Sequence, residues 1–287
     1  MSNVFKTTIL LTVMTLLFLL VGQALGGQRG MLMALVFAAV MNFISYFFSD
    51  KIALAAYRAQ PITRDQLPRV YNIVERLSQK VGLPMPKVYL IPTDSPNAFA
   101  TGRNPQHASV AVTQGILGLL NDDELEGVIA HELGHVRNRD ILISSIVATL
   151  AGAITWIANV AKWGMIFGGY GGDRDDRRGG GIAGLIMIFL APFAAILIQL
   201  AVSRSREYGA DDTGAHWTGN PYALASALAK IDAYSKQRPL VASPSTAHLF
   251  IIQPFLGGMS FGNLFSTHPP TAKRIERLTG RPAELSQ

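Results

Sequence analysis

The sequence contains no cysteine and few charged residues. The first absence restricts the possible metal ligands, and the second restricts the class of protein. Without cysteine there is no disulfide and no thiolate ligand, so any metal must be held by His, Asp or Glu. Charged residues make up 15% of the 287 residues, whereas an average soluble domain has about a quarter. Hydrophobic residues make up 49%. This composition favours a membrane protein over an ordinary soluble enzyme.

Two further patterns are absent, and each absence excludes a class of binding partner. No GxxxxGK[ST] phosphate loop occurs, so we expect no ATP and no built-in ATP-driven step. The net charge is +6, but the basic residues do not gather into a patch interleaved with aromatic residues. They lie mainly beside apolar runs, which indicates membrane orientation rather than nucleic-acid binding.

Four apolar segments each have roughly the 18 or more residues that are needed to span a bilayer. The first can also be read as a cleaved signal peptide, but only GGQRG separates it from the second, which favours a hairpin anchor. For the third and fourth, the alternative is a pair of buried core helices. The four segments run over about 8–25, 31–48, 141–167 and 182–202.

The Lys and Arg residues beside these segments predict their orientation, because basic residues favour the cytoplasmic side. If all four segments cross, seven flanking basic residues fall on one side and four on the other. We expect the first side to be the cytoplasm. The loop GGYGGDRDDRRGGG between the third and fourth segments then lies on the other side as an exposed connection.

These segments divide the chain into four expected parts, with both polar parts on the cytoplasmic side. They are an N-terminal transmembrane hairpin (1–48), a catalytic part with the HExxH helix (49–140), a second transmembrane hairpin (141–202), and a catalytic part with a third zinc ligand (203–287).

Local patterns predict the elements of the first polar part. Apolar residues recur at helical spacing over 65–81, and KVYLI (87–91) and ASVAVT (108–113) are strand candidates. Asn121 followed three residues later by Glu124 predicts a capped helix start.

The stretch IAHELGHVRNRD (129–140) places two histidines four residues apart around a glutamate. On a helix, His131 and His135 lie one turn apart on the same face and can together hold one Zn²⁺. Glu132 can then assist, as general base, the attack of a zinc-bound water. The alternative is a polar helix face that happens to contain two histidines.

Zinc requires a third protein ligand, and the spacing HExxHxxGxxH is absent because position 141 is Ile. His135 lies six residues before the third apolar segment, and Glu207 lies five residues after the fourth. Two antiparallel helices would place both side chains about 8–9 Å above the same membrane face. We therefore expect Glu207 to be the third ligand and Asp211, one turn on, to support a ligand histidine. A solvated helix face is the alternative for both.

Three motifs together resemble the HtpX family of bacterial membrane-bound zinc endopeptidases, which is related to the eukaryotic CAAX-prenyl endopeptidases. They are HELGH after two N-terminal spans, EYGAD after two more, and STHPPTAKRIERL near the end. The resemblance covers essentially the whole chain. It implies a multi-pass protease of the bacterial inner membrane, with an active site facing the cytoplasm, that cleaves misfolded or damaged membrane proteins during the stress response.

The fold that we expect is that of a mainly α integral membrane protein. It combines four transmembrane helices with a cytoplasmic zincin-like α+β metallopeptidase domain that contains a small β-sheet. The resemblance implies one zinc ion per chain, held by His131, His135 and Glu207, with Glu132 as the catalytic base. It also implies membrane-protein and unfolded polypeptide substrates. The sequence does not determine the oligomeric state.

The resemblance assigns two further pairs of residues to the substrate. NAFATG resembles the substrate-side strand of the family, which places Asn97 and Ala98 near the bound peptide backbone; an ordinary turn capped by Asn97 is the alternative. His268, with Arg274, matches a pair that steadies the substrate and the developing oxyanion. The alternative for this pair is a capping residue and a surface arginine.

A metal-binding membrane protein without protease activity is the rival class. A transporter should bury ionisable residues within its spans, and these spans offer only Lys162. A catalytically silent scaffold would keep the metal ligands but would not need Glu132. The presence of Glu132 at the position of the base favours the enzyme.

Overall fold

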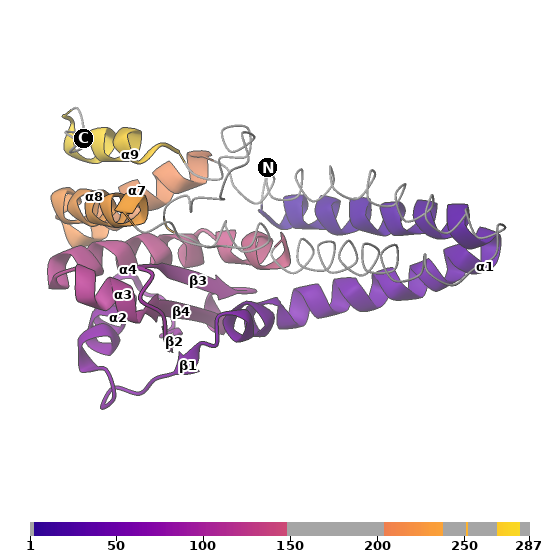
Figure 1. Cartoon of the computed structure of the whole chain (residues 1–287), viewed down its shortest axis with the longest axis horizontal. Coiled ribbons are helices and arrows are strands. Elements are labelled where there is room, and N and C mark those ends of the chain that lie inside the picture. The colour runs from indigo at the N-terminus through magenta and orange to yellow at the C-terminus, as the bar shows by residue number, and fades with distance from the viewer. Residues whose placement is uncertain (1–2, 148–203, 238–250, 252–268, 282–287) are drawn as a thin grey trace.

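The computed structural model describes residues 3–147, 204–237, 251 and 269–281. This part of the chain is mainly helical and contains one mixed four-stranded sheet. Figure 1 shows the long helix α1 at one end and the sheet with the shorter helices at the other. Most of the third apolar segment, the whole of the fourth, and His268 lie outside the described residues, so the predictions that concern them stay predictions.

Helix α1 (Asn3–Ala56) doubles back on itself at Gly27, so the first two apolar segments lie side by side as two legs (Figure 1). Gly27 has a φ of 57°, a left-handed conformation that glycine adopts without steric penalty. The legs are joined by a hydrogen bond of 2.9 Å from Asn42 Nδ2 to Thr15 Oγ1. This hydrogen bond satisfies a polar group of each leg within the apolar hairpin.

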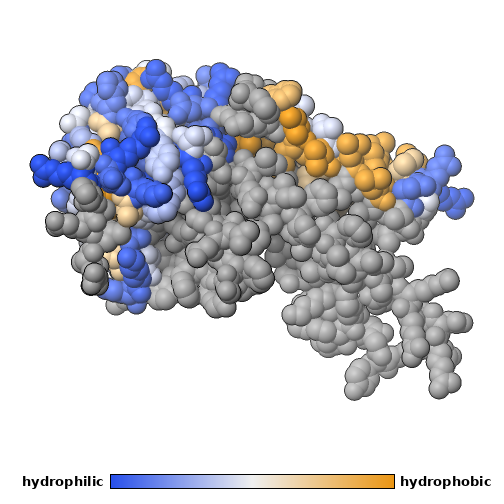
Figure 2. Space-filling model, turned by 90° about the horizontal axis from the view of Figure 1, so that it is seen from above, coloured by the Kyte–Doolittle hydropathy of each residue, from blue (hydrophilic) through white to orange (hydrophobic). Residues whose placement is uncertain are grey.

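The surface of α1 is strongly apolar. Its second leg, Gly27–Ala56, is the one helix in the described residues that is long and apolar enough to cross a membrane, and the first leg contains the shorter apolar stretch Thr7–Leu20. Figure 2 shows hydrophobic residues along this end and mainly hydrophilic residues at the opposite end. Leu32, Met33 and Val36 are among the large side chains exposed here. Apolar surface of this extent is typical of a membrane-contacting segment.

The sheet has the strand order β1-β2-β4-β3, in which β2 and β4 are parallel and the other two pairs are antiparallel. Two strands have the bounds predicted from the sequence, 87–91 and 108–113. The NAFATG segment supplies β3, which lies at the edge of the sheet that the described residues form and pairs with β4. The strands are β1 (Gln60–Pro61), β2 (Lys87–Ile91), β3 (Ala98–Gly102) and β4 (Ala108–Thr113).

The first polar part also contains the expected helices. Helix α2 (Pro68–Val81) begins three residues later than predicted, because Pro68 is favoured at the first helical position and ill suited to the interior. Helix α4 (Asp122–Arg137) begins with the predicted capping box, in which Asn121 and Glu124 accept each other's backbone N–H groups. Two short helices lie between β3 and α4: η1 (Pro105–His107) and α3 (Gln114–Leu119).

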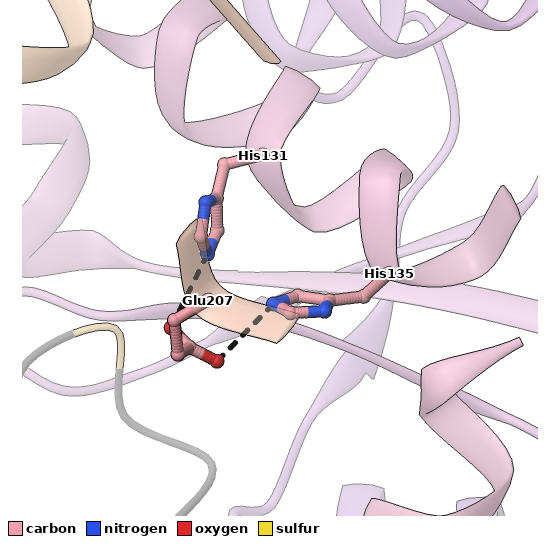
Figure 3. Close-up of side chains that lie close together, drawn as sticks. All are labelled: His131, His135 and Glu207. Carbon is pink, nitrogen blue, oxygen red and sulfur yellow. Dashed lines mark ion pairs between the residues drawn. The ribbon is translucent and has the colours of Figure 1, made fainter. Parts of the chain in front are cut away.

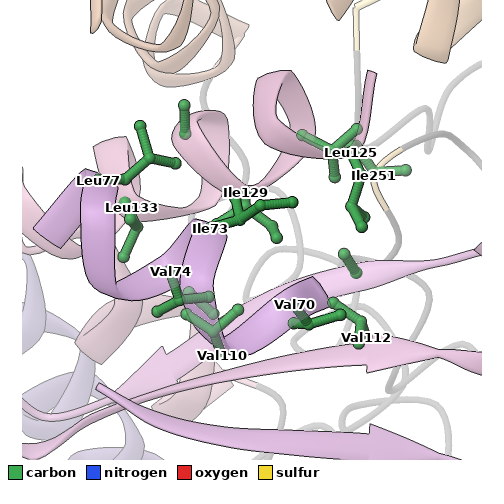
Figure 4. Close-up of a cluster of buried hydrophobic side chains, with 14 of the residues drawn as sticks. Val70, Ile73, Val74, Leu77, Val110, Val112, Leu125, Ile129, Leu133 and Ile251 are labelled. Carbon is green, nitrogen blue, oxygen red and sulfur yellow. The ribbon is translucent and has the colours of Figure 1, made fainter. Parts of the chain in front are cut away.

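The main core lies between α2, α4 and one face of the sheet (Figure 4). Its side chains interlock from all three elements, and replacing one such residue by alanine typically costs about 2–5 kcal/mol. This packing fixes α4, the helix that carries HExxH, relative to the sheet. The core includes Val70, Ile73, Val74, Leu77, Val110, Val112, Leu125, Ile129 and Leu133.

Two more helices cover the other side of α4, and a third packs on these two. The two are α7 (Arg204–Thr218) and α8 (Pro221–Gln237), and the third is α9 (Thr271–Thr279). A glycine allows α7 to approach α4 closely. A Cβ added at Gly214 would lie 2.9 Å from the backbone nitrogen of His131. The close crossing of α4 and α7 therefore depends on this missing side chain.

Candidate metal centre

The two histidines of HExxH and Glu207 come together at the crossing of α4 and α7. His131 and His135 project from successive turns of α4, and Glu207 lies in the first turn of α7. Figure 3 shows both imidazole rings directed at the carboxylate of Glu207. Nε2 of His131 lies 3.7 Å from Oε2, and Nε2 of His135 lies 3.5 Å from Oε1. All three donor atoms lie within 4.8 Å of one another.

This arrangement fits a divalent metal ion. Ligands at about 2.0–2.2 Å from a tetrahedral zinc ion are roughly 3.3–3.5 Å apart, close to the observed separations. Two imidazoles and a carboxylate are also a donor set typical of hydrolytic zinc sites. The expected ligand set, His131, His135 and Glu207, is therefore assembled as one metal-binding group.

Each ligand histidine has a carboxylate on its other ring nitrogen. Nδ1 of His131 lies 2.9 Å from Oδ1 of Asp211 on α7, as the sequence predicted for a supporting acid. Nδ1 of His135 is hydrogen bonded to Asp140 Oδ2 at 3.2 Å. Such carboxylates hold the proton on Nδ1 and leave Nε2 to bind the metal.

The sequence analysis missed Asp140. It lies just beyond α4 in the RNRD stretch, directly after Arg139, which has a φ of 58°. A positive φ at a non-glycine residue gives no signal in the sequence, so only the spacing of an acid five residues after His135 hinted at this contact.

Asp211 is held by a buried arginine. Arg274 donates from Nε to Asp211 Oδ2 at 2.8 Å and from Nη2 to Oδ1 at 2.7 Å. Burial opposes ionisation of Asp211, but Arg274 prevails and lowers the pKa of this carboxyl to about 2. Asp211 in turn raises the pKa of Arg274 against the effect of burial. Both groups are thus charged at neutral pH.

Glu132 is buried beside the histidines and meets the edge of the sheet. Its Oε2 accepts a hydrogen bond of 3.0 Å from the backbone N–H of Ala100 in β3. Burial raises the pKa of Glu132, and the negative charge of Glu207 adds to this effect, while His131 and His135 oppose it. A carboxylate with a raised pKa can take up a proton and release it again during one catalytic cycle.

Residues 64–282 match the sequence profile of the family described as Peptidase family M48. The chain belongs to the M48 peptidase family. Relatives named "Protease HtpX homolog" confirm the predicted HtpX resemblance. That of Desulfatibacillum aliphaticivorans is 58% identical over 280 residues, which cover 98% of this chain and 90% of that protein. That of Pyrococcus furiosus is 54% identical over 275 residues, which cover 95% and 94%.

A solved structure supports the fold of this M48 chain. The crystal structure of S. mikatae Ste24p superposes with a TM-score of 0.53 at 20% sequence identity, and the match covers 93% of the present chain. The present chain spans 62% of the length of that protein. The family and the metal-binding group together confirm the prediction of a metallopeptidase of the HtpX type.

The family resemblance assigned Arg274, Asn97 and Ala98 to substrate binding, and the structure places Arg274 apart from the other two. Arg274 is 1% exposed, and besides Asp211 it donates to the carbonyl oxygen of Ile251 at 2.8 Å. The alternative of a surface arginine is therefore wrong. Its contacts favour a role in holding Asp211 and Glu207, whose Oε2 lies 3.9 Å from Nη1, over direct contact with substrate.

Ala98 is the first residue of β3, and Asn97 directly precedes it. Asn97 is buried, and its Oδ1 accepts from the backbone N–H of Ile251 at 3.0 Å. Its backbone pairs with Thr113, the last residue of β4. The segment is thus a strand from Ala98 onward, and contact of Asn97 and Ala98 with substrate stays a prediction.

Proposed function

We propose that the protein is a zinc-dependent endopeptidase of the cytoplasmic membrane that hydrolyses misfolded or damaged membrane proteins and other unfolded polypeptides. One observation carries this proposal: the donor atoms of His131, His135 and Glu207 converge on one point, and Glu132 lies in the turn between the two histidines. The donor set and spacing support zinc as the metal, one ion per chain.

The chemistry that we propose is the hydrolysis of a peptide bond. A zinc ion bound here would polarise the scissile carbonyl and strengthen water as a nucleophile. Glu132 takes a proton from the attacking water as its oxygen bonds to the carbonyl carbon. It then passes this proton to the amine nitrogen as the C–N bond breaks. The hydrogen bond from Ala100 holds the carboxylate of Glu132 in place.

In the part of the chain that the structure describes, β3 pairs with a strand on one side only, and its other edge suits an extended substrate. One side of β3 pairs with β4, while the N–H of Ala100 points away from β4 toward Glu132. A peptide that is added as a further strand along this edge would run past Glu132 and the metal ligands. Asn97 and Ala98 would then flank the bound backbone. Only a loosened or unfolded chain can supply such a strand, which agrees with a role in quality control.

His268 is proposed to stabilise the oxyanion. It precedes Pro269 and Pro270, which stand before the first turn of α9, and a helix N-terminus carries a partial positive charge that favours an anion. Arg274, on the same helix, is proposed to support this residue through the network that it forms with Asp211 and Glu207.

The proposed topology has four transmembrane helices, with the metal site facing the cytoplasm. The apolar leg Gly27–Ala56 and the relatives named as HtpX homologs support a membrane location. Ile141, where the third apolar segment begins, follows closely after the ligand His135 and its partner Asp140. The site would therefore lie just above the hydrocarbon region, within reach of chains that emerge from the membrane.

The decisive experiment compares the wild type with Glu132→Gln and with a control, Glu126→Gln. Glu126 lies on the same helix and pairs with Arg76 at the surface, away from the metal ligands. Each protein is purified in detergent and assayed for zinc content and for cleavage of unfolded casein. We expect Glu132→Gln to keep one zinc per chain and to lose at least about 100-fold in cleavage rate. Glu126→Gln should match the wild type in both.

Two results would count against the proposal. Equal cleavage by the wild type and Glu132→Gln would remove Glu132 as the base and point to a contaminating protease. Zinc in all three proteins, with no cleavage of casein or of unfolded membrane proteins by any, would favour the silent metal-binding scaffold.

A further inference from the structure

A cavity of about 340 Å³ opens where the last turns of α1 meet the sheet, and none of the metal ligands lines it. Three segments line it: the end of α1, the start of β2, and the connection from β3 to β4. Neither the family match nor the peptidase chemistry assigns it a role.

The cavity carries an excess of positive charge. Lys51, Lys87 and Arg103 line it together with His107, and Asp50 is the one acidic residue among the described residues that line it. In the part of the chain that the structure describes, none of these three cations forms an ion pair with a carboxylate. Three unpaired cations around one cavity favour an anionic ligand.

Other cations on the surface of the protein are arranged differently. Several exposed arginines have a carboxylate partner, so an unpaired group of cations is not simply the rule for this surface. Such pairs are Arg64–Glu75, Arg76–Glu126 and Arg277–Asp212.

Aromatic rings hold two of the cavity cations in place. The guanidinium of Arg103 lies over the ring of Phe47 at 5.3 Å, and the ammonium of Lys51 lies over the ring of Phe48 at 5.1 Å. Both rings are partly exposed on α1. Lys and Arg residues that gather at the end of an apolar helix are typical of the boundary between hydrocarbon and headgroups.

The length of α1 places the cavity at that level. The apolar leg begins at Gly27, and about 20 residues separate Gly27 from Phe47, which corresponds to about 30 Å of helix. This is about the thickness of the hydrocarbon core of a bilayer. With Gly27 at the far boundary, Phe47 and the cavity lie at the near boundary, where lipid phosphates are found.

From this geometry we infer that the cavity binds the phosphate of an anionic phospholipid headgroup. Arg103 and Lys87 contact the phosphate, Lys51 faces it from α1, and the ring of Phe47, at the hydrocarbon boundary, borders the acyl chains. Asp50 accepts hydrogen bonds from hydroxyl groups of a glycerol headgroup. The inference rests on the proposed membrane location, but it does not depend on peptide hydrolysis.

The test measures lipid binding by the full chain purified in detergent, using native mass spectrometry. Dioleoyl phosphatidylglycerol is titrated in parallel with dioleoyl phosphatidylcholine and with glycerol phosphate, which has the anion but no acyl chains. The test variant is Lys87→Gln with Arg103→Gln. The control is Arg64→Gln with Lys236→Gln, which removes the same charge from exposed residues away from the cavity.

We expect phosphatidylglycerol to bind more tightly than phosphatidylcholine, and the test variant to bind it roughly 30-fold more weakly, because two cation–phosphate contacts are lost. The control should bind like the wild type. Casein cleavage and zinc content should be the same in all proteins, which separates a failure of this inference from a failure of the proposed peptidase.

Three outcomes would overturn the inference. Equal binding of phosphatidylglycerol by the test variant and the control would show that the lipid binds elsewhere. Equal binding of phosphatidylglycerol and phosphatidylcholine by the wild type would show that the headgroup charge is not recognised. Binding of glycerol phosphate as tight as that of the lipid would identify a site for a soluble anion.

Discussion

The carboxylate of Asp211 lies between a metal ligand and a buried arginine, with His131 Nδ1 at 2.9 Å on one side and Arg274 on the other. Its negative charge serves both neighbours at once. It orients the imidazole, and it neutralises a guanidinium that is 1% exposed. Removing that charge therefore affects metal binding and stability together.

We predict that Asp211→Asn weakens zinc binding by about 10–100-fold, because the imidazole of His131 loses the carboxylate that orients it. It should also lower the free energy of unfolding by about 3–5 kcal/mol, because Arg274 stays buried without its counter-ion. Chelator competition measures the first effect, and thermal unfolding of the metal-free protein measures the second.

The neighbouring Asp212 supplies the control. It pairs with Arg277 at the surface, where both side chains are 52% exposed, so Asp212→Asn should change stability by less than about 1 kcal/mol and leave zinc binding intact. Equal damage from both substitutions would contradict the role that we give to Asp211.

The pKa of His135 predicts how zinc binding depends on pH. Burial lowers the pKa of this imidazole, but Asp140 and Glu207 prevail and raise it to about 9 in the metal-free site. A proton therefore occupies His135 at neutral pH and must leave before the metal can bind. The apparent affinity for zinc should rise about tenfold per pH unit from pH 7 and level off near pH 9. An affinity that stays constant over this range, measured by chelator competition, would contradict the prediction.

At the scale of single residues, the sequence predicts those side chains whose chemistry depends on local spacing. The spacing of one helical turn predicts the roles of His131, Glu132 and His135. The distance of Glu207 from the end of an apolar segment predicts that it lies at the same height above the membrane. Asp140 and the burial of Arg274 do not follow, because they depend on a turn with positive φ and on contacts between distant helices.

The crossing of α4 and α7 brings the third ligand to the first two, and it depends on Gly214. A Cβ at this position would meet backbone atoms of His131 at 2.9 and 3.2 Å, and backbone cannot give way as a side chain can. Helix α7 would have to move as a unit, and it would carry Glu207 with it.

We predict that Gly214→Ala lowers the free energy of unfolding by about 1–3 kcal/mol and also weakens zinc binding. Gly209 on the same helix is the matched control, because a Cβ there would meet no atom of the described structure within 4 Å. Gly209→Ala should stabilise the protein by about 0.5–1 kcal/mol, since alanine favours the helix. Thermal unfolding and chelator competition on both variants test the pair, and a loss of zinc affinity in Gly209→Ala would contradict it.

The elements that the sequence predicts well are those with strong local signals. The bounds of β2 and β4 follow from short apolar runs, and the start of α4 follows from its capping box. The strand order does not follow. The parallel pairing of β2 with β4 leaves β3 at the edge beside Glu132, and this arrangement is set by packing against α4.

On the scale of the whole molecule, the polar and apolar ends of the protein imply a definite orientation in the membrane. The turn of α1 at Gly27 would lie on the side opposite to the metal site, and the exposed apolar residues between them would lie within the bilayer. The absence of cysteine makes this testable, because a single introduced thiol is labelled without background.

We predict that Arg29→Cys, next to the turn, reacts with a membrane-impermeant maleimide in intact cells. Asp65→Cys, in the exposed segment before α2, should react only after the cells are opened, because it lies on the side of the metal site. Val36→Cys should react with neither treatment until detergent is added, since its surroundings are lipid. Labelling of Arg29→Cys and Asp65→Cys from the same side would contradict the topology.

The metal ligands are divided between two helices that the ribosome makes at different times. About 70 residues separate His135 from Glu207, and at 5–20 residues per second their synthesis takes roughly 4–14 s. Arg274, which holds the partner of His131, is made later still. During this interval the nascent chain has two imidazoles but no carboxylate to complete the site. The division of the site along the chain therefore delays its assembly: a newly made molecule cannot complete its metal-binding group until Glu207 has been added, and Asp211 gains its buried counter-ion only when Arg274 has been added.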